Sequence, residues 1–98
     1  MSNLGLITAT KLQSVVRGLT AKGITLKASD RNEVRIDGYG WTIYVAVDDY
    51  RGTTLGAIAL LGDDGTNSHT HEVELILSPN PKAVLGTVLR AIKTYEVA

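Results

Sequence analysis

Residues 33–48 read EVRIDGYGWTIYVAVD, and this stretch decides the fold class. Apolar and polar residues alternate on both sides of the glycine-containing segment 37–40, which is the pattern of two half-buried strands joined by a tight turn. We therefore predict an antiparallel hairpin. In its second strand the core-facing residues are Trp41, Ile43, Val45 and Val47, and the outward-facing residues include Tyr44 and Ala46.

Three further segments carry strand signals. Residues 24–28 and 69–77 alternate in the same way, whereas residues 55–61 are apolar on both parities. A short, continuous apolar run is typical of a strand covered on both faces, and its register stays open in the sequence. Polar and glycine-containing turns separate successive strands, which predicts an antiparallel meander of about five strands.

Helical periodicity occurs only near the two ends of the sequence. A stripe of Leu12, Val15, Val16 and Leu19 predicts a helix over 9–22. We expect Thr8 or Thr10 to cap its start and Gly23 to follow its end. A second stripe between Val84 and Tyr95 predicts a helix over 81–95, with Asn80 as its cap and Pro81 as its first residue.

The predicted order is α-β-β-β-β-β-α. We expect one two-layer α+β domain spanning residues 1–98, with an antiparallel sheet and both helices packed on one of its faces. The absence of cysteine excludes disulfides, thiolate metal sites and thiol nucleophiles. There is no basic leader and no apolar run long enough to span a bilayer, so we expect a cytoplasmic protein with no membrane association.

The sequence contains no motif that indicates an enzyme. It lacks a nucleophile elbow, a phosphate-binding loop and a dinucleotide fingerprint. The neighbouring aspartates at 48–49 and 63–64 lie in expected loops, where solvated carboxylates are the ordinary interpretation. We therefore expect a protein without catalytic residues and without a cofactor.

Charges are sorted along the chain although the net charge is zero. Residues 1–36 carry six bases and two acids, residues 37–78 carry one base and seven acids, and residues 79–98 carry three bases and one acid. This sorting predicts a basic helical layer and an acidic remainder, which is a property of the surface potential rather than of the fold.

The sheet face away from the helices is the first candidate interface. If Ile58 and Leu60 face the core, the outward residues form an apolar patch bordered by Lys27, Arg35, Glu72 and Glu74. The residues assigned to that patch are Tyr44, Ala46, Ala57, Ala59, Leu61 and Ile76. The alternative is that a loop or a terminus covers the fourth strand, or that it is a central strand with small outward residues.

The helical layer is the second candidate. Its bases could contact phosphates or an acidic protein, although a solvated helix surface is the simpler interpretation. They are Lys11, Arg17, Lys22, Lys82, Arg90 and Lys93.

Two weaker candidates concern ring stacking and metal binding. Tyr39, Trp41, Tyr44 and Tyr50 with Arg51 could stack a nucleotide if they gathered, but the alternation places Trp41 in the core. His69 and His71 point the same way on a strand, as metal ligands would, with the aspartates at 48–49 and 63–64 as possible further ligands. A solvated strand start is the simpler interpretation, and we expect no metal.

The leading hypothesis is a small non-enzymatic protein-interaction module, such as an accessory or phage-type regulatory protein. It would self-associate as a homodimer or bind another protein through the sheet face. The alternative is binding of nucleic acid, or of an acidic protein, through the basic helical layer.

Overall fold

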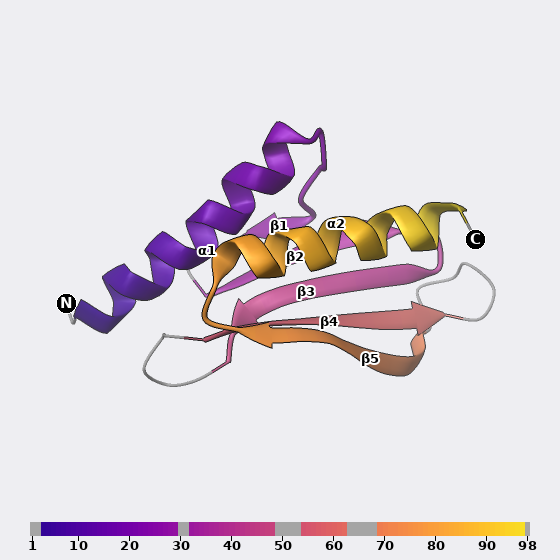
Figure 1. Ribbon diagram of the computed structural model, residues 1–98. Helices are drawn as coiled ribbons and strands as arrows, with labels where there is room; N and C mark the ends of the chain where they lie inside the picture. Colours follow the sequence, from indigo (N-terminus) through magenta and orange to yellow (C-terminus); the bar gives the residue numbers. More distant parts are fainter. Residues whose placement is uncertain (1–2, 30–31, 49–53, 63–68, 98) are drawn as a thin grey trace.

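Five strands lie side by side in chain order, and two helices lie on one side of the sheet (Figure 1). The computed structural model describes residues 3–29, 32–48, 54–62 and 69–97, with side chains described over 11–29, 32–48, 54–62 and 71–96. The elements are α1 (Asn3–Ala21), β1 (Ala28–Ser29), β2 (Glu33–Gly38), β3 (Trp41–Val47), β4 (Leu55–Gly62), β5 (His69–Ser78) and α2 (Pro81–Val97). Every neighbouring pair of strands is antiparallel, so the predicted α+β meander between two helices is confirmed.

The β2–β3 hairpin forms where the alternating pattern predicts it. Its turn is Tyr39-Gly40, and Gly40 has a φ of 81°, which a residue without a side chain adopts at little cost. Gly38 serves a different purpose, because a Cβ there would lie 2.0 Å from Cε2 of Trp41. The Trp41 ring therefore lies against the Gly38 backbone, is buried, and contacts the Tyr95 ring at a centroid distance of 5.9 Å.

The sequence correctly predicted how α1 ends and how α2 begins. Gly23 donates its N–H to Thr20 and Ile24 donates to Leu19, the paired hydrogen bonds of a Schellman motif with glycine at φ 81°. The side-chain oxygen of Asn80 accepts from the N–H of Lys82, as expected for a cap before a first-turn proline.

The start of α1 was predicted wrongly. The helix begins at Asn3, so Thr8 and Thr10 lie inside it and neither is its cap. Residues 3–10 contain no proline, and threonine in a helix interior costs less than about 0.7 kcal/mol relative to alanine, so these residues do not stop the helix.

The first strand is shorter than the alternation at 24–28 predicts. Of the described residues in this segment, Ala28 and Ser29 alone form strand pairs with β2, and Lys27 before them donates one backbone hydrogen bond to Arg35. Ile24 and Leu26 pack against the core instead. The chain uses these residues to cross from the helical layer to the sheet.

The sequence left the register of β4 open, and the observed register is the opposite of the one on which the apolar patch was assigned. Leu55, Ala57 and Ala59 are fully buried and face the helices, so Ala57 and Ala59 do not lie on the outer face. Leu61 has their parity, pairs with Trp41 and packs against the core. This register follows from the complementary volumes of the side chains that β3 and β4 place opposite each other.

That complementarity lies in two cross-strand pairs. Val45 is opposite Ala57 and Ile43 is opposite Ala59, so branched side chains on β3 fill the space that small ones on β4 leave. Because β4 is apolar on both parities, its own sequence does not predict which of its residues face the core.

The predicted outward position of Ile76 is wrong, because β5 contains an irregularity. Ala57 pairs with Ile76 and Ile58 with Glu74, which leaves Leu75 as an extra residue, a β-bulge. The bulge reverses the alternation, so Ile76 shares the face of buried Ala57 and packs against the core, while Leu77 is 53% exposed.

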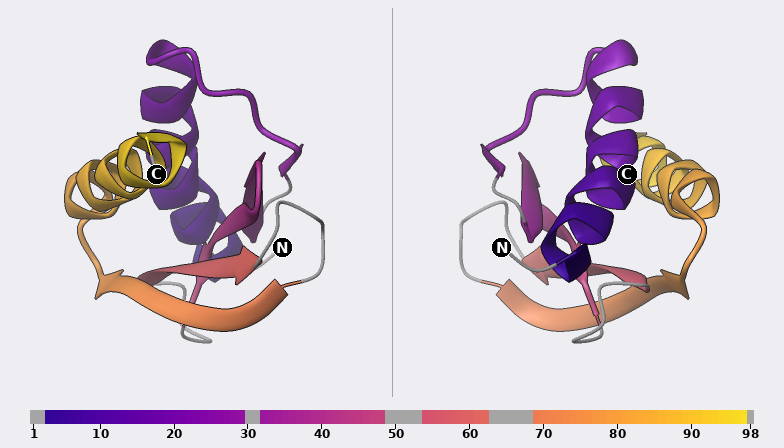
Figure 2. Two further views of the ribbon diagram at one scale, coloured as in Figure 1. Left: turned by 90° about the vertical axis from the view of Figure 1, so that its right-hand side faces the viewer. Right: turned by 90° about the vertical axis from the view of Figure 1, so that its left-hand side faces the viewer.

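The helices and the sheet share one core. The end-on views of Figure 2 show the sheet curling around both helices, with β5 beneath them and β1 beside them. The buried residues of α2, namely Val84, Val88 and Ile92, join those of α1, β2, β3 and β4, and partly buried residues of β5 pack against them. Within the described ranges, neither helix combines the length and apolar character needed to cross a bilayer.

Candidate functional site: the open face of the sheet

Three rows of side chains cross the face of the sheet that lies away from the helices. They follow from the strand register: Glu33–Ala46–Gly56–Leu77, Arg35–Tyr44–Ile58–Glu74, and Asp37–Thr42–Leu60–Glu72. Charged residues lie mainly at the ends of the rows and apolar or small residues in the middle. We call Tyr44, Ala46, Gly56, Ile58, Leu60 and Leu77 the open patch.

The open patch contains a groove of about 450 Å³ over β3 and β4. Tyr44, Ala46, Ile58 and Leu60 contribute apolar atoms to its lining, and Glu33 and Asp48 contribute carboxylates. Each of the four apolar side chains is only partly buried. Apolar surface with a charged border is typical of a binding surface.

At Gly56 the groove is open down to the backbone. A Cβ built at Gly56 would meet Asp48 Oδ1 at 3.5 Å and Leu77 Cδ1 at 3.6 Å, which are ordinary contact distances. The position therefore has room for a methyl group that the sequence does not place there, and the groove extends over the bare backbone between Asp48 and Leu77.

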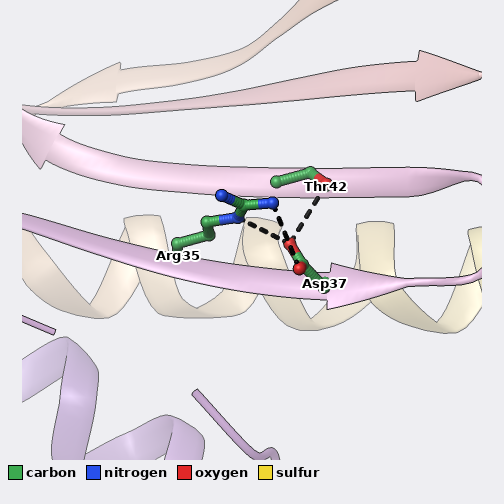
Figure 3. Close-up of polar contacts among 3 residues, drawn as sticks. All are labelled: Arg35, Asp37 and Thr42. Atoms are coloured by element: carbon green, nitrogen blue, oxygen red, sulfur yellow. Dashed lines mark hydrogen bonds and ion pairs between the residues drawn. The ribbon is translucent and has the colours of Figure 1, made fainter. Parts of the chain in front are cut away.

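A polar cluster occupies one end of the same face (Figure 3). Arg35 donates from Nε to Asp37 Oδ1 at 2.8 Å and from Nη2 to Oδ2 at 3.2 Å, and the Thr42 hydroxyl donates to Oδ1 at 3.1 Å. The Arg35 guanidinium also lies 5.7 Å from the centre of the Tyr44 ring, within the range of a cation–π contact.

The cluster changes the acidity of both charged groups. The hydrogen bonds from Arg35 hold the pKa of Asp37 below its ordinary value, and the bond from Thr42 acts in the same direction. The hydrogen bond with Asp37 raises the pKa of Arg35. The pair is bidentate and balances its own charge, so Arg35 contributes little positive potential to the rest of the face.

Three other carboxylates lie around the open patch, and we call them the acidic border: Asp48, Glu72 and Glu74. Asp48 lies beside the groove, while Glu72 and Glu74 lie on β5 opposite Leu60 and Ile58. Glu33 also lines the groove and interacts electrostatically with Arg35. A further base, Lys27, acts on Asp37 at the β1 side. Across the described part of this face, carboxylates therefore outnumber bases.

Sequence reasoning found part of this surface and missed its centre. Tyr44 and Ala46 lie on the open face as predicted, but the β4 residues there are Ile58 and Leu60 and the β5 residue is Leu77. Counting residues outward from the Tyr39-Gly40 turn of the hairpin would have paired Arg35 with Tyr44 and Asp37 with Thr42. No feature of the sequence predicts the bulge at Leu75.

The proposed aromatic cluster does not form among the residues that the structure describes. Trp41 is buried on the core side, Tyr44 lies on the open face, and Tyr39 is in the turn with 84% of its surface exposed. Tyr50 and Arg51 lie outside the described residues. Trp41 and Tyr44 are therefore on opposite sides of the sheet.

The described side chains form no group of three or more metal-ligating residues. His71 is exposed, and Asp48 lies beside the open-face groove. The side chain of His69 and the residues Asp49, Asp63 and Asp64 lie outside what the structure describes. The metal hypothesis gains no support from the described residues.

The bases of the helical layer lie on the other side of the molecule. Arg17, Lys22, Lys82, Arg90 and Lys93 are exposed, and Lys11 is partly buried. Lys22 and Lys93 border a groove of about 420 Å³ over Ile24, Leu89 and Ile92, with Glu96 also beside it. The charge sorting seen in the sequence therefore becomes a separation in space, with bases on the helices and carboxylates on the open face.

Comparison with known proteins identifies no relative: no protein-family model, curated protein or solved structure matches the chain.

Proposed function

We propose that this chain is a small non-enzymatic protein-interaction module that binds through the open patch. The supporting observation is the band of partly buried apolar side chains on the sheet face away from the helices, centred on Tyr44, Ile58 and Leu60 and bordered by carboxylates. A second protein surface placed there would remove this apolar area from water, which is the main favourable term in association.

Site-specific photo-cross-linking in cells of the native host tests the proposal. A photoreactive amino acid replaces Leu77, which is on the open face, or Gln13, which is exposed on α1. We expect an adduct from position 77 that disappears when Ile58→Glu is added, and no adduct of the same mass from position 13. The mass of the adduct distinguishes a homodimer from a complex with another protein.

Two results would contradict the proposal. One is an adduct from position 13 alone, which would assign binding to the helical layer. The other is an adduct from position 77 that persists in Ile58→Glu while circular dichroism shows that variant to be folded.

The alternative function is binding of nucleic acid or of an acidic protein through the basic helical layer. The observation in its favour is the set of exposed bases on α1 and α2, together with the groove between Lys22 and Lys93. Such binding weakens steeply as salt releases the counterions it depends on. Fluorescence anisotropy of labelled duplex DNA at low and high salt, with Lys82→Gln/Arg90→Gln/Lys93→Gln as the variant, tests it.

A further inference from the structure

We infer that the partner of the open patch is a basic amphipathic segment, in which apolar side chains are flanked by lysine or arginine. This inference rests on the proposed function and adds the chemical class of the partner. It follows from the acidic border, because carboxylates lie around the apolar centre on several strands.

The positions of the carboxylates set where partner bases can reach. Asp48 lies beside the groove after the end of β3, and Glu72 and Glu74 face Leu60 and Ile58 from β5. An apolar side chain seated over Ile58 and Leu60 thus has Glu72 and Glu74 on one flank and Asp48 at the other end of the groove. A partner with cations on both sides of an apolar stripe matches this layout.

Arg35, the base in the middle row of this face, is engaged with Asp37 rather than with the acidic border. Arg35 gives two N–H groups to Asp37 and lies near the Tyr44 ring, so its charge is balanced within the polar cluster. Among the described residues, no ion pair engages Asp48, Glu72 or Glu74, so these carboxylates are left for a partner or for solvent ions to neutralise.

Charge also opposes the other occupants of this face. Two copies of the chain joined through their open patches would bring two acidic borders together, and like charges across an interface cost affinity. Nucleic acid and anionic membranes are repelled for the same reason. The bare backbone at Gly56 beside Ala46 allows a partner element to approach closely over this part of the sheet.

Three synthetic peptides of equal length are the probes. The first has a leucine stripe flanked by lysines, the second has glutamate at every lysine position, and the third has serine at every leucine position. Isothermal titration gives their affinities, and methyl NMR signals of Ile58 and Leu60 report binding on the open face. We expect only the leucine–lysine peptide to shift these signals at micromolar concentrations, with affinity that falls as salt rises.

Charge-reversed variants assign the effect to the acidic border. Glu72→Lys/Glu74→Lys should weaken the leucine–lysine peptide about tenfold or more, because two attractive pairs become repulsive ones. The matched control is Lys82→Glu/Arg90→Glu, which reverses two charges on α2 and should leave the affinity within about twofold. Circular dichroism of both variants confirms that they are folded.

The outcomes separate this inference from the proposed function. Equal binding of the lysine and glutamate peptides at Ile58 and Leu60 would overturn the basic partner and keep the open patch as the interface. A homodimer cross-linked through position 77 would do the same. Shifts confined to α1 and α2 for every peptide, with no adduct from position 77, would overturn both.

Discussion

Gly38 and Gly56 both lie in strands, yet only one of them has room for a side chain. At Gly38 an added Cβ would clash with the Trp41 ring, whereas at Gly56 it would make ordinary contacts. We expect Gly38→Ala to destabilise the fold by about 1–3 kcal/mol, the usual cost of overpacking. Urea unfolding followed by fluorescence of Trp41, the single tryptophan of the chain, measures the change.

Gly56→Ala is the matched variant. Alanine in a strand loses less conformational freedom on folding than glycine does, so we expect a gain of about 0.5–1 kcal/mol in the free energy of unfolding. The same methyl group narrows the groove beside Asp48, so binding of the leucine–lysine peptide should weaken in a protein that is more stable. A destabilised Gly56→Ala would show that the backbone at this position cannot accept a side chain.

The Arg35–Asp37 pair gives the stability a dependence on acid pH. Its hydrogen bonds lower the pKa of Asp37 in the folded state, so the unfolded chain binds its proton first as the pH falls. The contribution of the pair is complete above the unfolded pKa, about 3.9, and is lost as the pH falls through the lower folded value. Because the Asp37 side chain is 30% exposed, we expect at most about 1 kcal/mol.

Asp37→Asn tests this dependence. Relative to the natural chain, its free energy of unfolding should be lower at pH 7, and the deficit should be smaller at pH 2, because the contribution of the charged pair is lost as the pH falls through the lowered pKa of Asp37. Urea unfolding at these two values gives the comparison. A deficit that is the same at both pH values would assign the effect to lost geometry rather than to charge.

At the scale of the elements, β5 decides which residues reach the open face. Because of its bulge at Leu75, the Ile76 side chain packs against the core and the Leu77 side chain is exposed. We expect Ile76→Glu to lower the free energy of unfolding by at least about 2 kcal/mol, because a carboxylate is forced against the core. Leu77→Glu should change it by no more than about 0.5 kcal/mol. Equal losses in urea unfolding would contradict the bulge.

The same element shows how far sequence reasoning extends. Element order, the β2–β3 hairpin, the glycine after α1 and the cap of α2 depend on neighbours in the chain, and they could be predicted. The register of β4 depends on which side chains of β3 lie opposite Ala57 and Ala59, and the bulge depends on how β5 follows β4. These are contacts between distant residues, so the centre of the candidate site could not be predicted.

At the scale of the whole molecule, the sequential sorting of charge becomes a polarity across the two layers. The fold places α1 and α2 on one side of the sheet and the acidic border on the other. Opposite charges on opposite sides make the chain electrically polar at zero net charge. A polyanion and a basic peptide should therefore bind to different layers.

Heparin as a polyanionic probe makes this separation measurable. In amide NMR spectra we expect heparin to shift signals of α1 and α2, including those next to Lys22 and Lys93, and to leave Ile58 and Leu60 unmoved, because the acidic border repels it. Neutralising Lys82, Arg90 and Lys93 together should weaken heparin binding without affecting the leucine–lysine peptide. Because the two layers lie on opposite sides of the molecule, the leucine–lysine peptide should still bind in the presence of saturating heparin. Shifts at Ile58, or simple competition between the two ligands, would contradict the polarity of the molecule.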